Sequence, residues 1–486
     1  MMASESSSWK ALHPASVLVN LLPRTWSVVK SMWPVFLIVL FGGRADGQSL
    51  FDAALLSVFL MLTIGGTVLH WWTLRYRIFE GRLEVQSGFL NRQTRVIAPD
   101  RIQNLETVSN VFHRISGLVE VRIETASGTE IEGLLSALSV EQAHQLMEAL
   151  EVLRKGSVVA VPEEELPVIA QNSLVDLFRF GATATRLGAA LVVVGFLFEG
   201  QRRLDTGLDV MTDLGWSGFL LGMVAVLTGT WLLGTGRAVV RHYGFTMVHT
   251  ATSLIATEGL LTRRRVELPR EKVQLVVVSE PLLRRWAGFG SVHIETAAAR
   301  AEGGGIQNAE AVIPVVETGE LYEVVRKAVP ALDVDLEALT LRPPAPMALV
   351  REFIATTWQS MLFAGAVSWW FWPWGVLATM ALPAGWLAVW LDHRHQGWLV
   401  TDEVIVARQG FLSRKTRIVA RSKLQSTEVS QGLFLRRYSL GRLAIRVAGN
   451  VVALPIVQMD EAMDIQQALL PRRRSLSDQN RSASTS

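Results

Sequence analysis

Long apolar stretches alternate along the chain with segments of short-period strand pattern, and this alternation occurs three times. The apolar stretches come in pairs, and the second member of each of the first two pairs has over 20 residues without Asp, Glu, Lys or Arg. That length crosses about 30 Å of hydrocarbon as a helix. The pattern predicts three transmembrane helix pairs, six helices in all, at residues 31–43 and 53–74, 187–198 and 214–236, and 354–371 and 374–391.

The first members of pairs one and two are short. Only residues 31–43 lie between Lys30 and Arg44, and only residues 187–198 between Arg186 and Glu199. At about 1.5 Å per residue, such helices cover about 20 Å. Whether they fully span a bilayer is therefore left open at this stage.

Each helix pair is followed by a segment with the pattern of paired strands. In the first such segment, residues 76–79 and 83–85 flank the turn pair Glu80-Gly81, and in the third, residues 398–400 and 404–406 flank a turn of Thr, Asp and Glu. Short apolar runs separated by turn residues are typical of hairpins. A helical pattern closes each segment, at residues 139–153, 320–329 and 461–470. We expect an α+β membrane protein in which the helix pairs alternate with three small β-barrel domains, each closed by a C-terminal helix.

The three strand-rich segments are copies of one unit. A glycine precedes a glutamine by 15 residues in every copy, and another 21 residues separate that glutamine from Glu124, Glu295 or Arg446. The repeat positions are Gly88 and Gln103, Gly259 and Gln274, and Gly410 and Gln425. The copies lie 171 and then 151 residues apart (88 to 259 to 410), which suits whole domains rather than solenoid units.

Composition and charge place the units relative to a membrane. Half of the residues are apolar, 19% are charged and 16 are Trp, whereas cysteine is absent, which excludes disulfides and thiolate chemistry. Lys and Arg gather on the flanks of the helix pairs that face the repeats, while the short connections within the pairs carry little positive charge. By the positive-inside rule, both termini and all three units face the cytoplasm. The net charge of +3 gives no reason to expect a nucleic acid partner.

These features divide the chain into seven predicted parts. They are an N-terminal segment with the first helix pair (1–75), the first repeat domain (76–160), the second helix pair (168–240), the second domain (241–330), the third pair (346–394), the third domain (395–471) and a disordered polar tail (472–486).

The glycine turns and the triplets that end at the three glutamines resemble those of bacterial PH-like membrane proteins of the YdbT type. The Gly-Phe-Leu turn and the following Thr-Arg pair occur at residues 88–95 and 410–417, whereas the second copy has Val266 in place of that last arginine. The resemblance covers nearly the whole chain. It implies PH-like domains, a multi-pass protein of the bacterial cytoplasmic membrane, and a smaller one-domain relative as partner.

Basic residues cluster after each glycine and form the candidate contact surface. Three interpretations compete: a solvated strand edge that prevents aggregation, attraction to anionic lipid headgroups, and a docking face for a partner protein or a second copy. The first hairpin turns are neutral or acidic, so specific phosphoinositide binding is not expected. The candidate residues are Arg92, Arg95, Arg263, Arg264, Arg265, Arg414, Lys415 and Arg417.

Other polar groups favour a structural role. We expect the repeat glycines to permit turns with positive φ and the repeat glutamines to hydrogen-bond a strand end. His393 and His395 lie at a membrane boundary with one neighbouring acid, so no metal site is predicted, and no catalytic motif or cofactor site stands out. We predict a non-catalytic scaffold or adaptor that contacts protein partners or anionic lipid. The alternative is a component of a transport, export or antimicrobial-resistance system.

Overall fold

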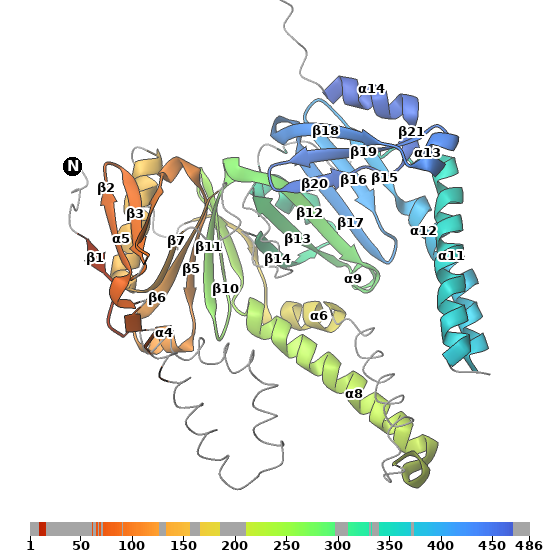
Figure 1. Cartoon of the computed structure of the whole chain (residues 1–486), viewed down its shortest axis with the longest axis horizontal. Helices are drawn as coiled ribbons and strands as arrows, with labels where there is room; N and C mark the ends of the chain where they lie inside the picture. The colour runs from red at the N-terminus through yellow and green to blue at the C-terminus, as the bar shows by residue number, and fades with distance from the viewer. Residues whose placement is uncertain are drawn as a thin grey trace, which may run out of the picture. The chain divides into compact units, whose positions relative to one another are not determined.

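The computed structural model describes residues 9–15, 61, 65–66, 68–69, 71–89, 91–125, 133–155, 166–184, 210–296, 310–329, 332, 340–370 and 374–469. The predicted helices at 31–43 and 187–198, almost all of the one at 53–74, His70 and the tail from residue 472 lie outside these residues. Figure 1 shows the chain with its elements labelled.

The first repeat forms two runs of antiparallel strands. The turn between its first two long strands places Glu80 at φ 48° and Gly81 at φ 71°. Positive φ at both central residues is the hairpin turn that matches strand twist, as the Glu-Gly pair predicted. The strands are β1 (Lys10–Ala11), β2 (Arg75–Phe79), β3 (Arg82–Ser87), β4 (Gln93–Ile97), β5 (Ile102–Ser109), β6 (Leu118–Thr125) and β7 (Gly133–Ser139).

The second and third repeats contain corresponding strands in the same order. In the second they are β8 (Val168–Gln171), β9 (Thr246–His249), β10 (Ser253–Glu258), β11 (Arg263–Pro269), β12 (Val273–Pro281), β13 (Phe289–Thr296) and β14 (Glu310–Glu317). In the third they are β15 (Gly397–Val400), β16 (Val404–Gln409), β17 (Ser413–Ala420), β18 (Leu424–Ser430), β19 (Leu440–Val447), β20 (Asn450–Ala453) and β21 (Val457–Gln458).

Neighbouring repeats share sheets, and for this reason the predicted closed barrels are wrong. The strand order β7-β6-β5-β11-β10-β9-β8 joins the first repeat to the second, and β14-β13-β12-β17-β16-β15 joins the second to the third. Figure 1 shows β11 beside β5 and β17 beside β12. The strand edge that would close a barrel within one repeat is occupied by the next repeat. The sheets are therefore open.

A β-bulge explains the fixed position of the repeat glutamines. In each repeat the register between the glutamine-bearing strand and the next strand shifts across one residue, between Ile102 and Asn104 in β5, Val273 and Leu275 in β12, and Leu424 and Ser426 in β18. The residue passed over is Gln103, Gln274 or Gln425. A bulge bends a strand and strengthens its twist. The glutamine spacing therefore marks a bend that all three repeats share.

Helices end the repeats as the sequence predicted. Helix α5 (Val140–Lys155) begins with a reciprocal capping box: the Ser139 hydroxyl accepts from the Gln142 amide at 3.1 Å, and the Gln142 side chain accepts from the Ser139 amide at 3.3 Å. Its counterparts are α10 (Leu321–Ala328) and α14 (Met459–Leu469). Leu146 and Leu150 of α5 are buried in the core of the first repeat, with Leu83, Val121 and Leu135.

The chain leaves each repeat and returns to the same place. Strand β1 pairs with β2, β8 pairs with β9, and Arg342 forms a β-bridge with Trp398 in β15. The residues before each membrane segment are thus hydrogen-bonded to the first strand after it. Each membrane segment therefore starts and ends at the same edge of a sheet.

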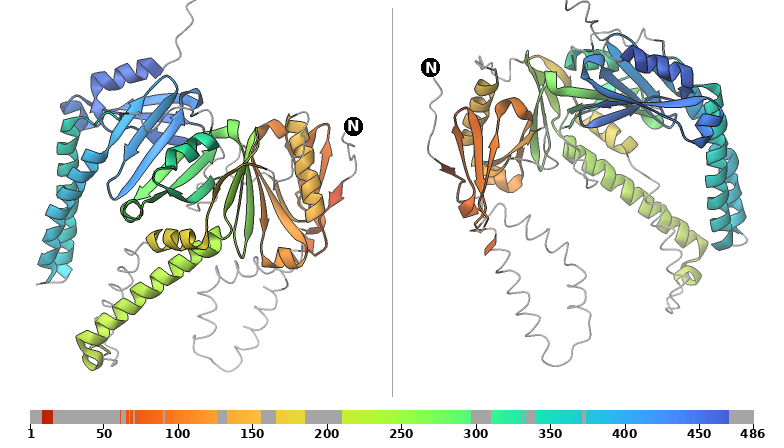
Figure 2. Two further views of the ribbon diagram at one scale, coloured as in Figure 1. Left: turned by 180° about the vertical axis from the view of Figure 1, so that it is seen from behind. Right: turned by 45° about the horizontal axis from the view of Figure 1, so that its top comes forward.

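Two described helix pairs occupy these segments. Helix α6 (Leu174–Ala184) lies beside the long helix α8 (Val210–His242), and α11 (Pro346–Trp370) lies beside α12 (Ala381–His395), with the 3₁₀ helix η5 (Trp374–Met380) between them in sequence. Both pairings are visible in Figures 1 and 2.

The prediction of six transmembrane helices is wrong for the described part of the chain. Only Leu221–His242 there is a helical stretch long and apolar enough to cross a membrane. In the third pair, the predicted second helix is divided between η5 and α12, and the 15 residues of α12 extend only about 22 Å. Helix α11 has 25 residues, but Arg351 and Glu352 lie in its second turn.

The described residues form two compact units. Residues up to Lys272 belong to the first, and β12, β13 and the residues from Val312 onward belong to the second. The boundary falls inside the second repeat, between β11 and β12. Each shared sheet is therefore a feature of one unit.

Glu124 gives a test of the bulge region by pH. It lies opposite Asn104, whose amide donates to its carboxylate at 3.4 Å, and it is 8% exposed. Burial raises the pKa of Glu124, and the hydrogen bond from Asn104 only partly opposes this. Because the pKa is higher in the folded than in the unfolded state, this group favours folding at low pH, and that contribution is lost as the pH rises through the folded pKa.

We therefore expect Glu124→Gln to raise the unfolding temperature of the full chain in detergent at pH 8. The gain should shrink as the pH falls, and it should vanish below about pH 4, where the wild-type carboxyl group is protonated in both states. The matched control is Glu295→Gln at the same repeat position, where the side chain is half-buried, and it should change the temperature less. A Glu124→Gln gain that does not depend on pH would contradict the assignment.

Candidate contact surface

The turn after each repeat glycine is tight, and only glycine fits it. Gly88, Gly259 and Gly410 have φ of 95°, 109° and 88°, in the region that residues with a Cβ rarely adopt. A Cβ on these glycines would lie 2.1, 2.0 and 2.3 Å from the carbonyl oxygen three residues later. The turn therefore folds back closely, and the residues after the glycine project from its tip.

The tips are apolar and exposed. Phe89 is 57% exposed, Leu260 40%, Leu261 55% and Leu412 60%. Several large apolar side chains on the tips of successive repeats are unusual for a surface that meets only water. We call the tips at residues 88–91, 259–262 and 410–413 the glycine turns.

Two glycine turns are hydrogen-bonded to the carboxyl ends of long helices. The amides of Gly259 and Leu260 donate to the carbonyls of Tyr243 and Val240 at 2.8 and 3.0 Å, at the end of α8. In the other compact unit, the Phe411 amide donates to the Asp392 carboxylate near the end of α12 at 2.8 Å. The apolar tips are thus held beside the ends of apolar helices.

A buried contact fixes the strand that leads into the second turn. His242, the last residue of α8, lies 2.6 Å from the carboxylate of Glu258 through its Nδ1, and both side chains are at most 10% exposed. Phe180 of α6 packs edge-on against the His242 ring at a centroid distance of 5.3 Å. Helix pair and sheet are thereby joined at the base of the turn.

A short helix in each repeat adds to the same surface. These helices are α4 (Val111–Ile115), α9 (Leu282–Trp286) and α13 (Leu433–Arg437). Arg114 of α4 donates to the Leu260 carbonyl at 3.0 Å, and the Leu282 amide of α9 donates to the Leu412 carbonyl at 2.8 Å. The short helix of one repeat therefore touches the glycine turn of the next.

The short helices also expose large apolar side chains. Ile115 is 79% exposed, Trp286 76% and Leu433 90%. The sequence analysis missed these helices. The available signal was the residue 14 positions after each glutamine, Gly117, Gly288 or Ser439, which has positive φ in every repeat and ends the short helix.

The predicted basic residues divide into two groups. Arg92, Arg95, Arg263 and Lys415 are exposed, whereas Arg264, Arg265, Arg414 and Arg417 are partly covered. Arg417 donates to the Gln409 side chain at 3.2 Å within its own repeat. Arg264 and Arg414 hold neighbouring repeats together, so they are not a free surface for lipid.

An Arg–Glu pair crosses each shared sheet. Arg414 of β17 binds Glu280 of β12 through Nε at 3.1 Å and Nη2 at 2.5 Å, and the Glu280 side chain is 3% exposed. Arg264 of β11 binds Glu106 of β5, whose side chain is 4% exposed. Burial alone would lower the pKa of Arg264, but the Glu106 carboxylate outweighs burial and raises it. Both pairs are two-residue contacts between repeats distant in sequence.

The two shared sheets have one register. Arg263 lies opposite Ser109 and Arg414 opposite Glu280, so the fourth residue after the glycine (259 to 263, 410 to 414) faces the sixth after the glutamine (103 to 109, 274 to 280). We call β4, β11 and β17 the glycine strands and β5, β12 and β18 the glutamine strands. Each shared sheet joins a glutamine strand to the glycine strand of the next repeat.

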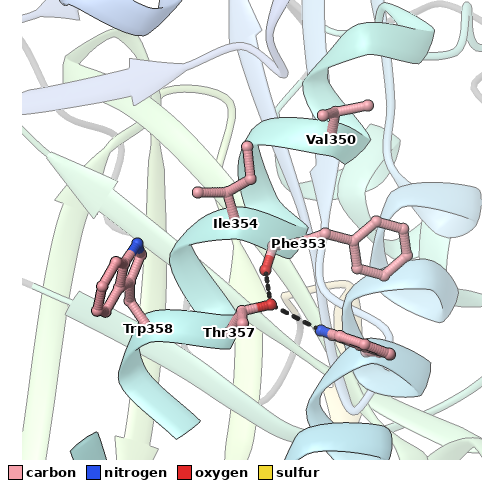
Figure 3. Close-up of a pocket in the computed structure, with 6 residues that line it drawn as sticks. Val350, Phe353, Ile354, Thr357 and Trp358 are labelled. Atoms are coloured by element: carbon pink, nitrogen blue, oxygen red, sulfur yellow. Dashed lines mark hydrogen bonds between the residues drawn. The ribbon is translucent and has the colours of Figure 1, made fainter. Parts of the chain in front are cut away.

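A shallow apolar hollow of about 470 Å³ lies between α11 and α12, and Figure 3 shows five of its six lining residues labelled. Its polar groups bind one another: the Trp386 indole donates to the Thr357 hydroxyl at 2.9 Å, and that hydroxyl donates to the Phe353 carbonyl at 2.7 Å. The lining residues therefore offer no free polar group to orient a substrate. The hollow suits an acyl chain better than a reacting molecule.

The two histidines near the end of α12 do not form a metal site with other side chains. His395 makes a 2.7 Å contact through Nδ1 with the Leu391 carbonyl, and it packs on Phe411 at 4.8 Å. Within the described residues, no three His, Cys, Asp or Glu side chains are arranged to hold a metal ion.

The repeats, their glycine turns and their shared sheets agree with the comparison to known families. The family described as "Bacterial PH domain" matches residues 34–153, 189–328 and 349–473. The chain belongs to the bacterial PH domain family. The resemblance seen in the sequence is therefore confirmed, and the PH-like domains are three copies.

One relative is similar along its whole length. The UPF0699 transmembrane protein YdbT of Bacillus subtilis (strain 168) is 25% identical over 468 residues, which cover 91% of this chain and 93% of that protein. No solved structure matches the chain.

The Arg–Glu pairs between repeats can be tested by a double-mutant cycle. Arg414→Ala leaves the Glu280 carboxylate buried without its partner, so we expect a loss of about 3 kcal/mol in the unfolding free energy. Arg414→Ala with Glu280→Ala should lose less than the sum of the single changes, because the orphaned charge is removed with it. Denaturant unfolding of the full chain in detergent measures both values.

The matched control is Arg446→Ala. Its pair with Glu428 lies on the surface, with both side chains more than half exposed, so the loss should stay below about 1 kcal/mol. Equal losses for Arg414→Ala and Arg446→Ala would show that the shared sheet does not depend on its Arg–Glu pair.

Proposed function

We propose that this protein is a non-catalytic scaffold of the bacterial cytoplasmic membrane. Helix α8 anchors it, and its PH-like repeats lie on the cytoplasmic face. The glycine turns and short helices enter the membrane interface, and the exposed basic residues beside them meet anionic headgroups. The scaffold offers strand edges to protein partners of the same PH-like kind.

The observation that carries this proposal is the direct bonding of exposed apolar turns to helix ends. Leu260 and Leu261 are exposed within one turn of the carboxyl end of the apolar stretch Leu221–His242. Side chains held there lie at the depth of the lipid headgroups if the helix spans the bilayer. Exposed Trp286 and the nearby Arg263 and Lys415 have the chemistry of that layer, in which aromatic rings and basic groups are enriched.

The orientation follows from charge and connectivity. Arg237 and Arg241 lie at the repeat-facing end of α8, which favours the cytoplasmic side for that end. The strands before and after each membrane segment are paired with one another, so a segment that leaves a repeat returns to it. This supports one common side for the three repeats. The name of the B. subtilis relative, a transmembrane protein, agrees with a membrane location.

The non-catalytic part of the proposal rests on the chemistry of the described groups. The polar atoms of the helix-pair hollow satisfy each other, and the strongest ion pairs join repeats rather than line a cleft. A transport or export component is the alternative from the sequence. The described part of the chain offers no observation that favours it.

Single cysteines test whether the turns enter the membrane. The chain has no native cysteine, so Leu261→Cys or Leu412→Cys can carry one environment-sensitive fluorophore in the full protein, reconstituted into phosphatidylglycerol vesicles. We expect a blue-shifted emission and strong quenching by lipids brominated near the headgroup. Vesicles of phosphatidylcholine should retain part of the shift, because the apolar contribution does not need anionic lipid.

The matched control is Glu403→Cys in the other turn of the third repeat, which is exposed and acidic in character. Its label should report water and little quenching. If the Leu261 and Leu412 labels behave like the Glu403 label, the turns do not enter the interface and the proposed membrane contact fails. Arg263→Ala with Lys415→Ala should reduce the difference between the two lipids, at about 1 kcal/mol per basic residue.

A further inference from the structure

We propose that copies of this chain assemble head to tail by strand addition. The glutamine strand of the third repeat in one copy, β18, pairs with the glycine strand of the first repeat in the next copy, β4. The pairing extends beyond the chain the contact that already joins its repeats. It does not depend on the lipid contact proposed above.

The repeat arrangement leaves one edge of each kind unused. The glycine strands β11 and β17 are paired with the glutamine strands β5 and β12 of the preceding repeats. Among the described residues, β4 and β18 are each the last strand of their sheet. An open edge carries unpaired backbone donors and acceptors and is a template for strand addition. One copy thus has a complementary edge at each end of its repeat series.

Burial at equivalent positions shows that these edges lack a cover found elsewhere. Val96 of β4 is 52% exposed, whereas Glu267 and Ile418, at the same position eight residues after the glycine (88, 259 and 410), are 4% and 1% exposed. Strand β12 is buried along most of its length, whereas Gln425, Ser426, Glu428 and Ser430 of β18 are exposed. The covered positions differ because β11 and β17 have a neighbouring repeat and β4 does not.

The shared register predicts the contacts of the new pair. With the fourth residue after the glycine opposite the sixth after the glutamine, Gln93 faces Ser430, Thr94 faces Val429, Arg95 faces Glu428 and Val96 faces Thr427. All of these residues lie in β4 or β18. The four pairs therefore need no change in either strand.

Charge supports a second copy as the occupant. In both shared sheets, a glutamate from the glutamine strand binds an arginine from the glycine strand. The predicted pairing sets Arg95 directly opposite Glu428, in the same sense and as close in register as Arg414 is to Glu280. Because the two edges differ, the contact is heterologous and can extend to further copies in one plane.

Disulfide trapping between two tagged copies tests the register. One full-length copy carries Thr94→Cys and the other Val429→Cys, each with its own tag, in the same membrane; a second set uses Gln93→Cys and Ser430→Cys. Two sets are needed because adjacent pairs of an antiparallel ladder alternate between wide and narrow spacing, and the narrow one favours a bond. With no native cysteine, a reducible species bearing both tags reports only the new contact.

The off-register control combines Gln93→Cys with Val429→Cys, whose side chains would point to opposite faces of the sheet. We expect a band with both tags for at least one in-register set and a roughly tenfold lower yield for the control. Equal yields, no band with both tags, or trapping only to a smaller chain of another protein would each overturn assembly between copies.

A charge exchange gives a second readout without disulfides. Arg95→Glu should reduce co-purification of two differently tagged copies by roughly tenfold, because two acids then face each other. Adding Glu428→Arg to the same chain should restore its self-association and leave it unable to pair with Arg95→Glu copies through β4. Restoration without the second change, or no loss with the first, would contradict the proposed pairing.

Discussion

The pairing of a glutamine strand with the glycine strand of the next repeat is the contact on which the rest of this fold depends. It satisfies two rows of backbone groups at once, and it places a buried Arg–Glu pair at each junction. An open strand edge would otherwise be left in every repeat. The repeats therefore cannot be treated as separate barrels connected by linkers, since the middle repeat shares one sheet with each neighbour.

The same contact places the membrane-facing surface. When the glycine strand lies against the preceding repeat, its turn comes beside that repeat's short helix, as the bonds from Arg114 to Leu260 and from Leu282 to Leu412 show. Exposed apolar tips and helices then form a continuous surface at each junction. Hydrogen bonds to the ends of α8 and α12 hold these tips beside the long helices. Sheet pairing and proposed membrane contact are thus two consequences of one arrangement.

Local features of this fold could be predicted from the sequence, but contacts between repeats could not. The Glu80-Gly81 hairpin and the capping box of Ser139 depend on residues a few positions apart, and both are found. The bulge at Gln103 was visible as a fixed spacing, although its cause was not. Arg264 and Glu106 are separated by 158 residues, and no local pattern links them. The basic residues were therefore interpreted as a rim, although two of them are buried partners.

The helix prediction failed for a different reason. Apolar composition was used as a measure of length, but residues 374–391 include a 3₁₀ helix, which interrupts the stretch before α12 begins. Only α8 combines length with composition among the described residues. Hydropathy located the greasy segments correctly, whereas the boundaries of the helices depended on local backbone geometry.

Amide hydrogen exchange on the full chain in detergent, under conditions where it is monomeric, tests the central claim most directly. If neighbouring repeats share sheets, the outward-facing amides of the glycine strands β11 and β17 should exchange as slowly as those of interior strands, whereas the corresponding amides of β4 should exchange quickly. Fast exchange in all three glycine strands would show that the repeats are not joined in this way.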